Sequence, residues 1–356
     1  MVETLRVAIL GATGLVGQRF VSILSHHPWF SLEALYSSPE KAGARYGDVV
    51  EWAIDDRPDS WIWRVKLRKL DPEAVAGEKF DVVFSALPSE VASKVEPVMA
   101  RMGVRIVSNA SNLRMDPDVP LLNPEVNAEH ASIAETQIAS RGWRGWVAKV
   151  PNCTTAILTL ALKPLHDEYG VKRVLVATMQ AVSGAGLRGV SAVQITDNII
   201  PYIRGEEEKV ERESRKILGG LEEGKITLSP IQVSATTTRV PVLDGHLEAV
   251  FAELEEEPGS RGEVERVLEE FRGNKLRGLN LPSAPERPIV VRREHDRPQP
   301  RLDRMEGGGM SVVVGRVRLD PVAGGVKMVV LGHNTIRGAA GNGVLIAELM
   351  HRLGYL

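Results

Sequence analysis

The start of the chain contains the feature that most restricts its fold, a short apolar strand that runs into a glycine-rich turn. We expect the strand over residues 5–10 (LRVAIL), the turn GATGLVG over 11–17, and a helix over 15–26. The three glycines permit a tight turn, a close approach of the backbone to a pyrophosphate, and close packing of helix on strand. The helix start offers free N–H groups to an anion. The predicted cofactor-binding residues here are Gly11, Thr13, Gly14, Leu15, Val16 and Gly17.

The end of the second predicted strand, over 31–37, indicates which dinucleotide is bound. In NAD-binding proteins an acidic residue about 20 residues after the glycine turn bonds the adenosine ribose. This chain instead has Ser37 and Ser38 at that point, followed by Lys41 and Arg45. Hydroxyl and cationic groups suit a 2′-phosphate better than a bare ribose, so we predict NADP as the cofactor.

Strand-like and helix-like segments alternate through the first half of the chain. Further strands are expected over 63–67, 81–87 and 104–110, and a helix over 89–102 with Ser89 as its N-cap. This alternation predicts a parallel, doubly wound sheet.

From about residue 153 the segments become longer and richer in β-branched residues. Helices are expected over 154–169, 206–218 and 336–354, the second of them highly charged. The Pro- and Arg-rich stretch 283–304 is expected to be an ordered surface connection. A large antiparallel or mixed sheet is predicted from five long strands, over 172–182, 232–242, 246–255, 310–319 and 326–334.

Charge and cysteine content restrict the compartment and the partners. The chain of 356 residues has a formal net charge of -2, which gives no electrostatic argument for nucleic acid or an anionic membrane as partner. No apolar run reaches the roughly 20 residues that a membrane helix needs. A single cysteine cannot form an internal disulfide. We therefore expect a soluble cytoplasmic protein that binds neither nucleic acid nor membrane, and we predict no metal site.

The single cysteine, Cys153, lies in the segment VPNCTTAIL. A free cysteine is usually a small packing residue. This one begins a predicted helix, where the helix dipole and free amides are expected to lower its pKa. Its neighbours Asn152 and Thr154 provide hydrogen-bond donors, and a thiolate beside a nicotinamide makes acyl-enzyme redox chemistry possible. We therefore favour a catalytic thiol.

A catalytic thiol needs a proton-transfer partner, and the chain has eight histidines. His246 follows a glycine turn and begins a predicted strand, seven residues after Arg239. His333 is nearly as good a candidate, and the residues alone do not separate the two.

Several longer motifs, in order along the chain, carry a family resemblance. The chain resembles the aspartate-semialdehyde dehydrogenases, specifically their archaeal and fungal branch, from residue 5 to the C-terminus. The motifs are GATGLVG, NASNLRMDPDVPLLNPEVN, PNCTT, QAVSGAG, DNIIPYIRGEEEKVERESRKIL, TRVPVLDGH, GMSVVVGR and HNTIRGAAG.

The resemblance implies a reaction and its central residues. The family interconverts L-aspartyl-4-phosphate and L-aspartate 4-semialdehyde with NADP(H) and phosphate, in the biosynthesis of lysine, threonine, methionine and isoleucine. By resemblance, Cys153 forms the thioester, His246 is the general acid/base, Gln180 orients the substrate, and Arg239 pairs with its α-carboxylate.

The resemblance also implies the remaining ligands. Arg114, Lys216 and Asn152 are expected to hold the phosphate. The glutamate for the substrate ammonium is Glu213 by its spacing from Lys216, or Glu207 or Glu208 by the GEEEK string, and the sequence does not decide between them. The further cofactor contacts are Ser85, Leu87, Ser183, Gly184 and Asn334.

The implied architecture is α/β. It combines a Rossmann-type NADP-binding domain (1–152 plus 335–356) with an α+β catalytic and dimerisation domain with a large mixed sheet (153–334), assembled as a homodimer or homotetramer. Malonyl-CoA reductase of the same superfamily, the more distant N-acetyl-glutamyl-phosphate reductase and a non-catalytic NADP-binding protein are the alternatives. The acidic cluster at Glu206, Glu207 and Glu208 favours aspartyl phosphate, because malonyl-CoA has no ammonium group.

Overall fold

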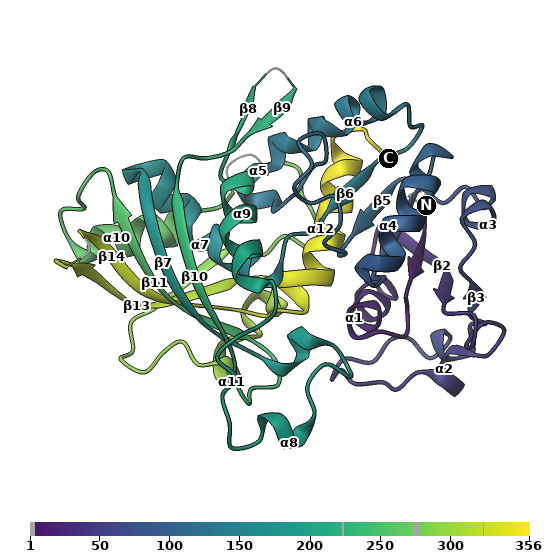
Figure 1. Ribbon diagram of the computed structural model, residues 1–356, viewed down its shortest axis with the longest axis horizontal. Helices are drawn as coiled ribbons and strands as arrows, with labels where there is room; N and C mark the ends of the chain where they lie inside the picture. The colour runs from purple at the N-terminus through teal and green to yellow at the C-terminus, as the bar shows by residue number, and fades with distance from the viewer. Residues whose placement is uncertain (1–3, 223, 274–275, 277, 323) are drawn as a thin grey trace.

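The computed structural model describes residues 4–222, 224–273, 276, 278–322 and 324–356. Two domains lie side by side, each built on a six-stranded sheet (Figure 1). Within these residues, no helix is both long and apolar enough to cross a membrane.

The first sheet is parallel throughout, with the order β3-β2-β1-β4-β5-β6. The doubly wound arrangement predicted from the alternating segments is thus confirmed. Its strands are β1 (Leu5–Leu10), β2 (Phe30–Ser37), β3 (Arg68–Lys69), β4 (Val82–Ser85), β5 (Ile106–Ser108) and β6 (Val147–Lys149). The helices of this part are α1 (Leu15–Leu24), α2 (Tyr46–Val49), η1 (Ile62–Arg64), α3 (Pro72–Gly77), α4 (Ser89–Arg101), α5 (Pro124–Asn127), η2 (Ala128–Ser132) and α6 (Ile133–Arg141).

The second sheet is mixed, with the order β10-β7-β11-β14-β13-β12. The pairs β7–β10 and β12–β13 are parallel, and the other neighbours are antiparallel. Its strands are β7 (Val171–Gln180), β10 (Gln232–Arg239), β11 (His246–Leu254), β12 (Ile289–Arg292), β13 (Val312–Asp320) and β14 (Gly325–Gly332). The other elements are α7 (Cys153–Tyr169), η3 (Val182–Ala185), α8 (Ala192–Ile195), α9 (Glu206–Ile217), the hairpin β8 (Gly220–Glu222) and β9 (Lys225–Thr227), α10 (Arg261–Glu270), α11 (Pro300–Asp303) and η5 (Glu306–Gly309).

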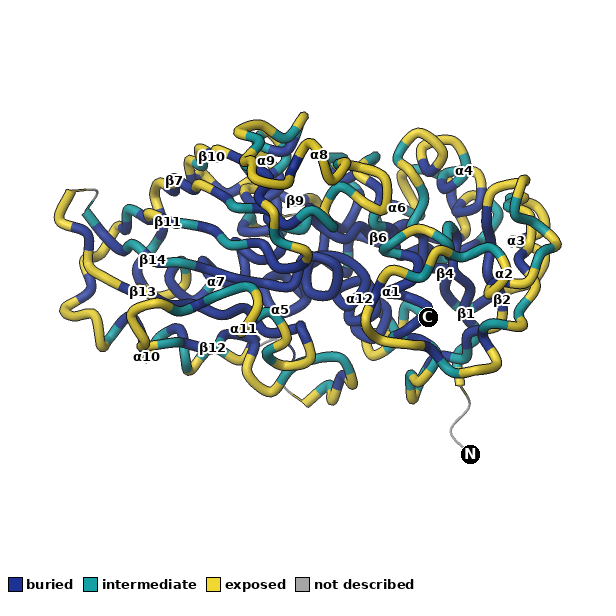
Figure 2. Tube along the Cα trace, turned by 90° about the horizontal axis from the view of Figure 1, so that it is seen from below, coloured by how far each residue is buried: buried dark blue, intermediate teal, exposed yellow. Residues whose placement is uncertain are grey.

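Two buried helices run through the middle of the molecule (Figure 2). Helix α7 packs its apolar residues against the second sheet, with Ile157 and Leu158 fully buried. The chain then ends in a π-helical turn, η6 (Ile336–Ala340), and α12 (Gly341–Arg352). Helix α12 belongs to the same core as α1, in which Val344 and Leu345 pack in one cluster with Phe20.

Three local predictions are wrong. Residues 63–67 are not a strand, because Trp63 stacks on Tyr46 and meets Trp52 in an aromatic cluster that turns the chain through η1; the strand follows at β3. Ser89 is the first residue of α4 rather than its N-cap, and its hydroxyl bonds that of Ser111. The stretch 283–304 contains the sheet strand β12, whose residues pair with β13.

Candidate active site

A pocket between the two domains contains the single cysteine. It is lined by residues from the first domain, from α7 and α9, and from the segment that joins β14 to α12. These residues are Val16, Ser89, Asn109, Ser111, Arg114, Pro151, Asn152, Cys153, Ser183, Gly184, Glu206, Lys209, Asn334, Thr335, Gly338 and Ala339.

The predicted catalytic residues other than Cys153 come from one end of the second sheet. Arg239 on β10 is the register partner of Gln180 on β7. His246 begins β11 next to Leu247, whose partner Met179 precedes Gln180. All three side chains are buried. Three adjacent strands thus present a guanidinium, an amide and an imidazole in one row beside the start of α7.

The cysteine and the histidine are in direct contact. Cys153 Sγ lies 3.2 Å from His246 Nε2, and the backbone N–H of Ala181 donates to His246 Nδ1 at 3.1 Å. Because a backbone N–H can only donate, Nδ1 accepts, and the proton of the neutral ring is at Nε2. The pKa of His246 is well below its usual value because the ring is buried and lies near Arg239 and His333. The ring is therefore neutral and presents an N–H to the sulfur.

The expected lowering of the thiol pKa is wrong for this structure. Burial and, to a smaller extent, the nearby carboxylate of Glu206 raise the pKa of Cys153 to about 12, although Arg239 and the Thr154 amide oppose the shift. Desolvation at the base of the pocket thus outweighs the helix terminus. Of the charges around the sulfur, Glu206 and Arg239 act in opposite directions.

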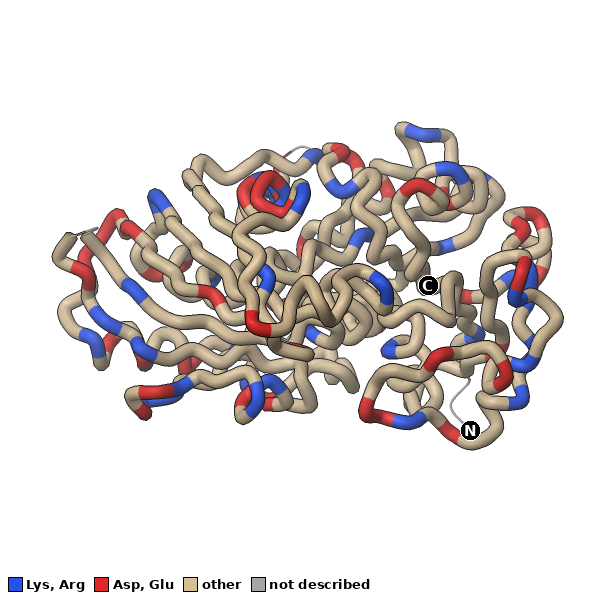
Figure 3. Tube along the Cα trace, turned by 60° about the horizontal axis from the view of Figure 1, so that its bottom comes forward, with Lys and Arg blue, Asp and Glu red and all other residues tan. Residues whose placement is uncertain are grey.

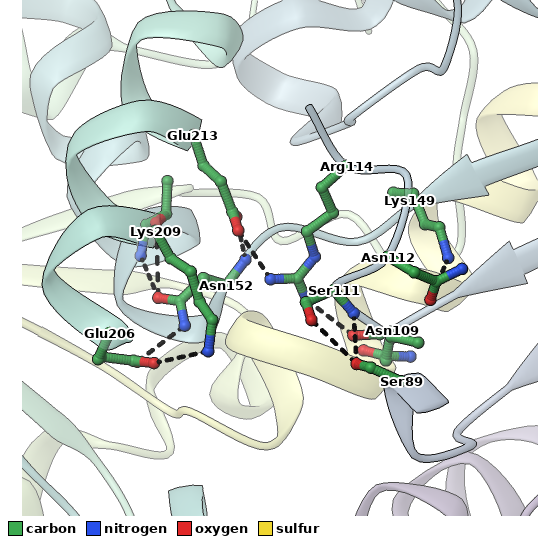
Figure 4. Close-up of polar contacts among 12 residues, drawn as sticks. Ser89, Asn109, Ser111, Asn112, Arg114, Lys149, Asn152, Glu206, Lys209 and Glu213 are labelled. Carbon is green, nitrogen blue, oxygen red and sulfur yellow. Dashed lines mark hydrogen bonds and ion pairs between the residues drawn. The ribbon is translucent and has the colours of Figure 1, made fainter. Parts of the chain in front are cut away.

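Asn152 connects the thiol to α9. Its side-chain oxygen caps α7 by accepting from the Thr155 amide at 3.2 Å. Its side-chain nitrogen donates to Glu206 at 2.8 Å, and its backbone N–H donates to Glu213 at 2.6 Å. Figure 4 shows both glutamates reaching from α9 toward this residue. Two carboxylates one heptad apart therefore hold the residue that precedes Cys153.

Arg114, predicted to hold the phosphate, lines the pocket, and it also makes internal bonds. Its guanidinium donates to Glu213 at 2.9 Å and to the Asn109 carbonyl at 2.7 Å (Figure 4). The buried Nε has no partner among the described residues. Because Glu213 bonds both this guanidinium and the Asn152 backbone, it is occupied by the protein itself and does not line the pocket.

The prediction for Lys216 is wrong, because its ammonium does not face the pocket. It is buried and donates to the carbonyls of Arg114 at 2.6 Å, Asp116 at 2.6 Å and Val119 at 2.7 Å. This lysine holds the 114–119 loop in place. The cation of α9 that lines the pocket is Lys209, which the sequence reasoning missed.

The glutamates of α9 also need correction. Glu207 accepts the Thr237 amide of the edge strand β10 at 2.9 Å, and Glu208 is exposed to solvent. The pocket carboxylate is Glu206, with its Oε2 3.5 Å from Lys209 Nζ. The helical period could have identified it, because position 206 lies four residues before the buried apolar Val210.

The glycine turn has the shape required to hold a pyrophosphate. Gly11 has a left-handed φ of 79°, and a Cβ there would lie 2.7 Å from the Ala86 carbonyl oxygen. A Cβ at Gly17 would lie 2.2 Å from the Gly11 carbonyl oxygen. Gly14 caps α1, and Leu15 and Val16 form its first turn, whose amides have no partner within the helix. The residues present therefore fit a dinucleotide phosphate group.

The neighbouring strand ends add polar groups. Ser37 ends β2 and bonds the Ser38 carbonyl, while Lys41 Nζ lies 3.4 Å from the Thr13 hydroxyl. At the end of β4, Ser85 is buried with a hydroxyl that lacks a partner within the described chain. Leu87 follows two residues later and is half-buried. These groups lie at the carboxyl ends of the strands, next to the glycine turn that follows β1.

The remaining predicted cofactor residues meet beside the thiol. Asn334 donates to the Ser183 hydroxyl at 2.7 Å and accepts the Gly245 amide at 2.8 Å. Ser183, Gly184 and Asn334 all line the pocket. In the part of the chain that the structure describes, no three His, Cys, Asp or Glu side chains are grouped to hold a metal ion.

A glycine-turn nucleotide domain joined to a mixed-sheet domain with a thiol–imidazole pair is the arrangement expected of a dehydrogenase with a sulfur nucleophile. Two family models match: "Semialdehyde dehydrogenase, NAD binding domain" over residues 6–134 and "Semialdehyde dehydrogenase, dimerisation domain" over 162–337. An aspartate-semialdehyde dehydrogenase of Archaeoglobus fulgidus is 50% identical, with 97% of each chain covered. The chain belongs to the aspartate-semialdehyde dehydrogenase family.

The solved structures agree with this assignment. A crystal structure titled as the aspartate semialdehyde dehydrogenase of Candida albicans with NADP has a TM-score of 0.89 and 40% identity, covering 99% of this chain and 100% of that chain. A malonyl-CoA reductase (NADP) of Metallosphaera sedula is 36% identical, covering 100% of this chain and 99% of its own. The predicted fold and family are thus confirmed, and the malonyl-CoA alternative is the more distant one.

Proposed function

We propose that this protein catalyses the NADP-dependent, reversible reductive dephosphorylation of L-aspartyl-4-phosphate to L-aspartate 4-semialdehyde. The observation that supports it best is the 3.2 Å contact between Cys153 Sγ and His246 Nε2, in a pocket that also receives the cofactor turn of α1. A nucleophile, a proton donor and a hydride carrier are the three components that reduction of an acyl phosphate through a thioester requires.

The sulfur of Cys153 attacks the acyl carbon of the substrate, and the bond from that carbon to the phosphate oxygen breaks. The thiol proton leaves with the phosphate as hydrogen phosphate, and a thioester remains on Cys153. Bound NADPH supplies the hydride that reduces the thioester. The N–H of His246 stabilises negative charge first on the sulfur and then on the oxygen of the resulting thiohemiacetal. Cleavage of the carbon–sulfur bond releases the aldehyde and regenerates the sulfur nucleophile.

The substrate charges have matching partners in the pocket and in the buried row of side chains beside it. Arg239, whose Nη1 donates to the Ala181 carbonyl at 2.7 Å, keeps the rest of its guanidinium for the α-carboxylate. Glu206 takes the ammonium group, and Arg114 and Lys209 take the phosphate, with Asn152 beside them. Gln180, next to Arg239 in the same row, orients the substrate at the thiol.

The cofactor is held by residues from both domains. Gly11, Thr13, Gly14, Leu15, Val16 and Gly17 hold the pyrophosphate, and Ser37 and Ser38 the 2′-phosphate. Ser85, Leu87, Ser183, Gly184 and Asn334 line the remainder of the cofactor site.

The proposal extends to domain boundaries, assembly and compartment. Residues 1–152 with 335–356 form the cofactor domain, since Val344 of α12 shares a core with Phe20 of α1. The other domain, 153–334, assembles the protein into a homodimer or homotetramer, and it exposes the cross-strand neighbours Leu175 and Phe251 on its sheet. A thiol nucleophile suits the reducing cytoplasm.

A substrate comparison tests the function. Steady-state turnover is measured with aspartate semialdehyde plus phosphate and, separately, with malonyl-CoA, each with NADP(H) and NAD(H). We expect turnover of the first substrate with the phosphorylated cofactor. A preference for malonyl-CoA would contradict the proposed substrate.

The variant Cys153→Ala tests the nucleophile. We expect it to abolish turnover while NADPH binding, measured by fluorescence titration, stays near that of the wild type. Substantial residual turnover would rule out the thioester route.

A further inference from the structure

One buried cation outside the pocket joins the cofactor helix to the turn that leads into His246. Arg19 lies on α1, and its side chain is 4% exposed. Its Nε donates to the Thr335 hydroxyl at 3.0 Å, and its Nη2 lies 3.7 Å from the Asp244 carboxylate. Thr335 lies between β14 and α12, directly before η6, and Asp244 lies two residues before His246. A single guanidinium thus contacts both segments that flank the catalytic row.

The two segments that Arg19 contacts are also bonded to each other. Asn334, next to Thr335, accepts the Gly245 amide at 2.8 Å and donates to the Ser183 hydroxyl at 2.7 Å. The Asp244 carbonyl accepts from Arg304 at 3.2 Å. Asp244 itself is 7% exposed, so its carboxylate depends on protein partners for compensation. The Asp244–Gly245 turn is therefore held on several sides, and Arg19 is its contact with α1.

We propose that Arg19 is a positioning residue that fixes the distance between the cofactor helix α1 and the Asp244–Gly245 turn leading into His246. The proposal rests on the proposed function. Hydride transfer requires the cofactor, whose pyrophosphate is held by the first domain, to meet the thioester, held by the second. A misplacement of about 1 Å between reacting groups can cost on the order of 100-fold in rate. The contact between Cys153 and His246, by contrast, is made by α7 and β11 and does not involve α1.

The chain contains a matched control for this contact. Arg19 has a third partner, Asp56, whose carboxylate lies 3.1 Å from Nη1. The Asp56 side chain is 56% exposed, and that of Asp244 is 10% exposed. Water replaces an exposed partner at little cost, whereas a buried charge that loses its partner stays uncompensated. Loss of the Asp56 carboxylate should therefore leave the positioning intact.

The test compares two rates in the full-length protein. The first is the single-turnover rate of NADPH formation after excess enzyme is mixed with NADP, phosphate and aspartate semialdehyde. The second is the rate at which iodoacetamide alkylates Cys153, which needs no cofactor. For Arg19→Met and Asp244→Asn we expect the first rate to fall about 10- to 100-fold and the second to stay unchanged. For Asp56→Asn we expect neither to change.

The readouts separate positioning from a loss of folded protein. Unfolding of a fraction of the molecules lowers the amplitude of the single turnover, while misplacement lowers its rate. If Arg19→Met does not fold, Arg19→Lys replaces it in the test, because lysine retains the charge but not the forked contacts. Its single-turnover rate should lie between that of the wild type and the roughly 10- to 100-fold lower rate expected for Arg19→Met. An unchanged hydride rate, a parallel fall in alkylation, or equal effects of Asp56→Asn and Asp244→Asn would overturn the proposal. A wild-type protein without NADP-dependent turnover would instead contradict the proposed function.

Discussion

Helix α9 carries the same motif twice, and the two copies do different things. Glu206 and Lys209 form one Glu-x-x-Lys pair, and Glu213 and Lys216 form the other, one heptad later. The first pair lines the pocket that contains Cys153. The second is used inside the protein, where Glu213 bonds Arg114 and Asn152 (Figure 4). Lys216 bonds three backbone carbonyls. The two pairs have the same spacing on the same face of α9. Only the segments that lie opposite them decide whether a pair faces the pocket or bonds the rest of the protein.

The two pairs also differ in how available their charged groups are to a ligand. Acidic and basic residues are interspersed over both domains (Figure 3), and most are solvated. On α9 the Glu206 side chain is 8% exposed, while that of Lys209, which lines the pocket, is 36% exposed. The Glu206 carboxylate at the pocket surface and the partly solvated Lys209 ammonium group remain available to a ligand. The second pair is not available, because its charged groups are bonded within the protein.

The largest expected effect separates the two lysines. Lys216→Met leaves the buried carbonyls of Arg114 and Val119 without a donor, while the Asp116 carbonyl keeps only the Val119 N–H. We expect it to lower the free energy of unfolding by roughly 3–5 kcal/mol. Chemical denaturation measures this change. Lys209→Met is its matched control, and its stability should stay close to that of the wild type, because the side chain is partly solvated. Equal destabilisation by the two variants would contradict the assignment of Lys216 as a support.

The second effect concerns activity. Lys209→Met removes a charge-assisted bond to phosphate, so we expect kcat/KM to fall about 10- to 100-fold, chiefly through a higher KM for phosphate. Steady-state kinetics with phosphate as the varied substrate measures it. The neighbouring Glu208→Gln, at an exposed position, should leave the kinetics unchanged. An unchanged KM for phosphate in Lys209→Met would contradict the assignment of this lysine to the phosphate site.

The third effect separates the glutamates. Glu206→Gln cannot pair with the substrate ammonium, and we expect kcat/KM for aspartate semialdehyde to fall about 10- to 100-fold with stability nearly retained. Glu213→Gln weakens the bonds to Arg114 and to the Asn152 backbone, so its main effect should be on thermal stability. Thermal unfolding and steady-state kinetics are measured on both variants. If Glu213→Gln lowered kcat/KM and Glu206→Gln lowered thermal stability instead, Glu213 would be the glutamate of the substrate site.

The sequence predicted the elements of this fold well because their signals are local. The glycine turn after β1 and the helix start at Cys153 depend on neighbours in the chain, and both form where expected. The wrong predictions depended on distant contacts. The environment of Lys216 is set by carbonyls about 100 positions away, and Trp63 turns the chain because Tyr46 and Trp52 lie against it.

The contact from Arg19 to Asp244 joins positions far apart in the chain in the same way, and no local pattern indicates it. The assignment of His246 over His333 came from the family resemblance, and the structure places the former against the sulfur. The latter is buried beside Asp244, and burial lowers its pKa to about 4. Residues that act through bonds to other segments are thus the ones that a single sequence leaves undetermined.

The smallest expected effect is on the thiol itself, and it has opposite signs for two neighbours. Only the thiolate is alkylated, so the rate rises with pH until the pKa of Cys153 is passed. Burial and Glu206 together raise that pKa to about 12, and Arg239 opposes the rise. The alkylation rate of the wild type should therefore still be rising at pH 9.

Glu206→Gln should react several-fold faster than the wild type at a given pH, and Arg239→Met should react more slowly. A substrate ammonium that neutralises Glu206 acts in the same direction as Glu206→Gln, so the pocket would activate its nucleophile when the correct substrate binds. The same rate in both variants would mean that these charges do not reach the sulfur, and a wild-type plateau below pH 8 would mean that the helix terminus outweighs burial.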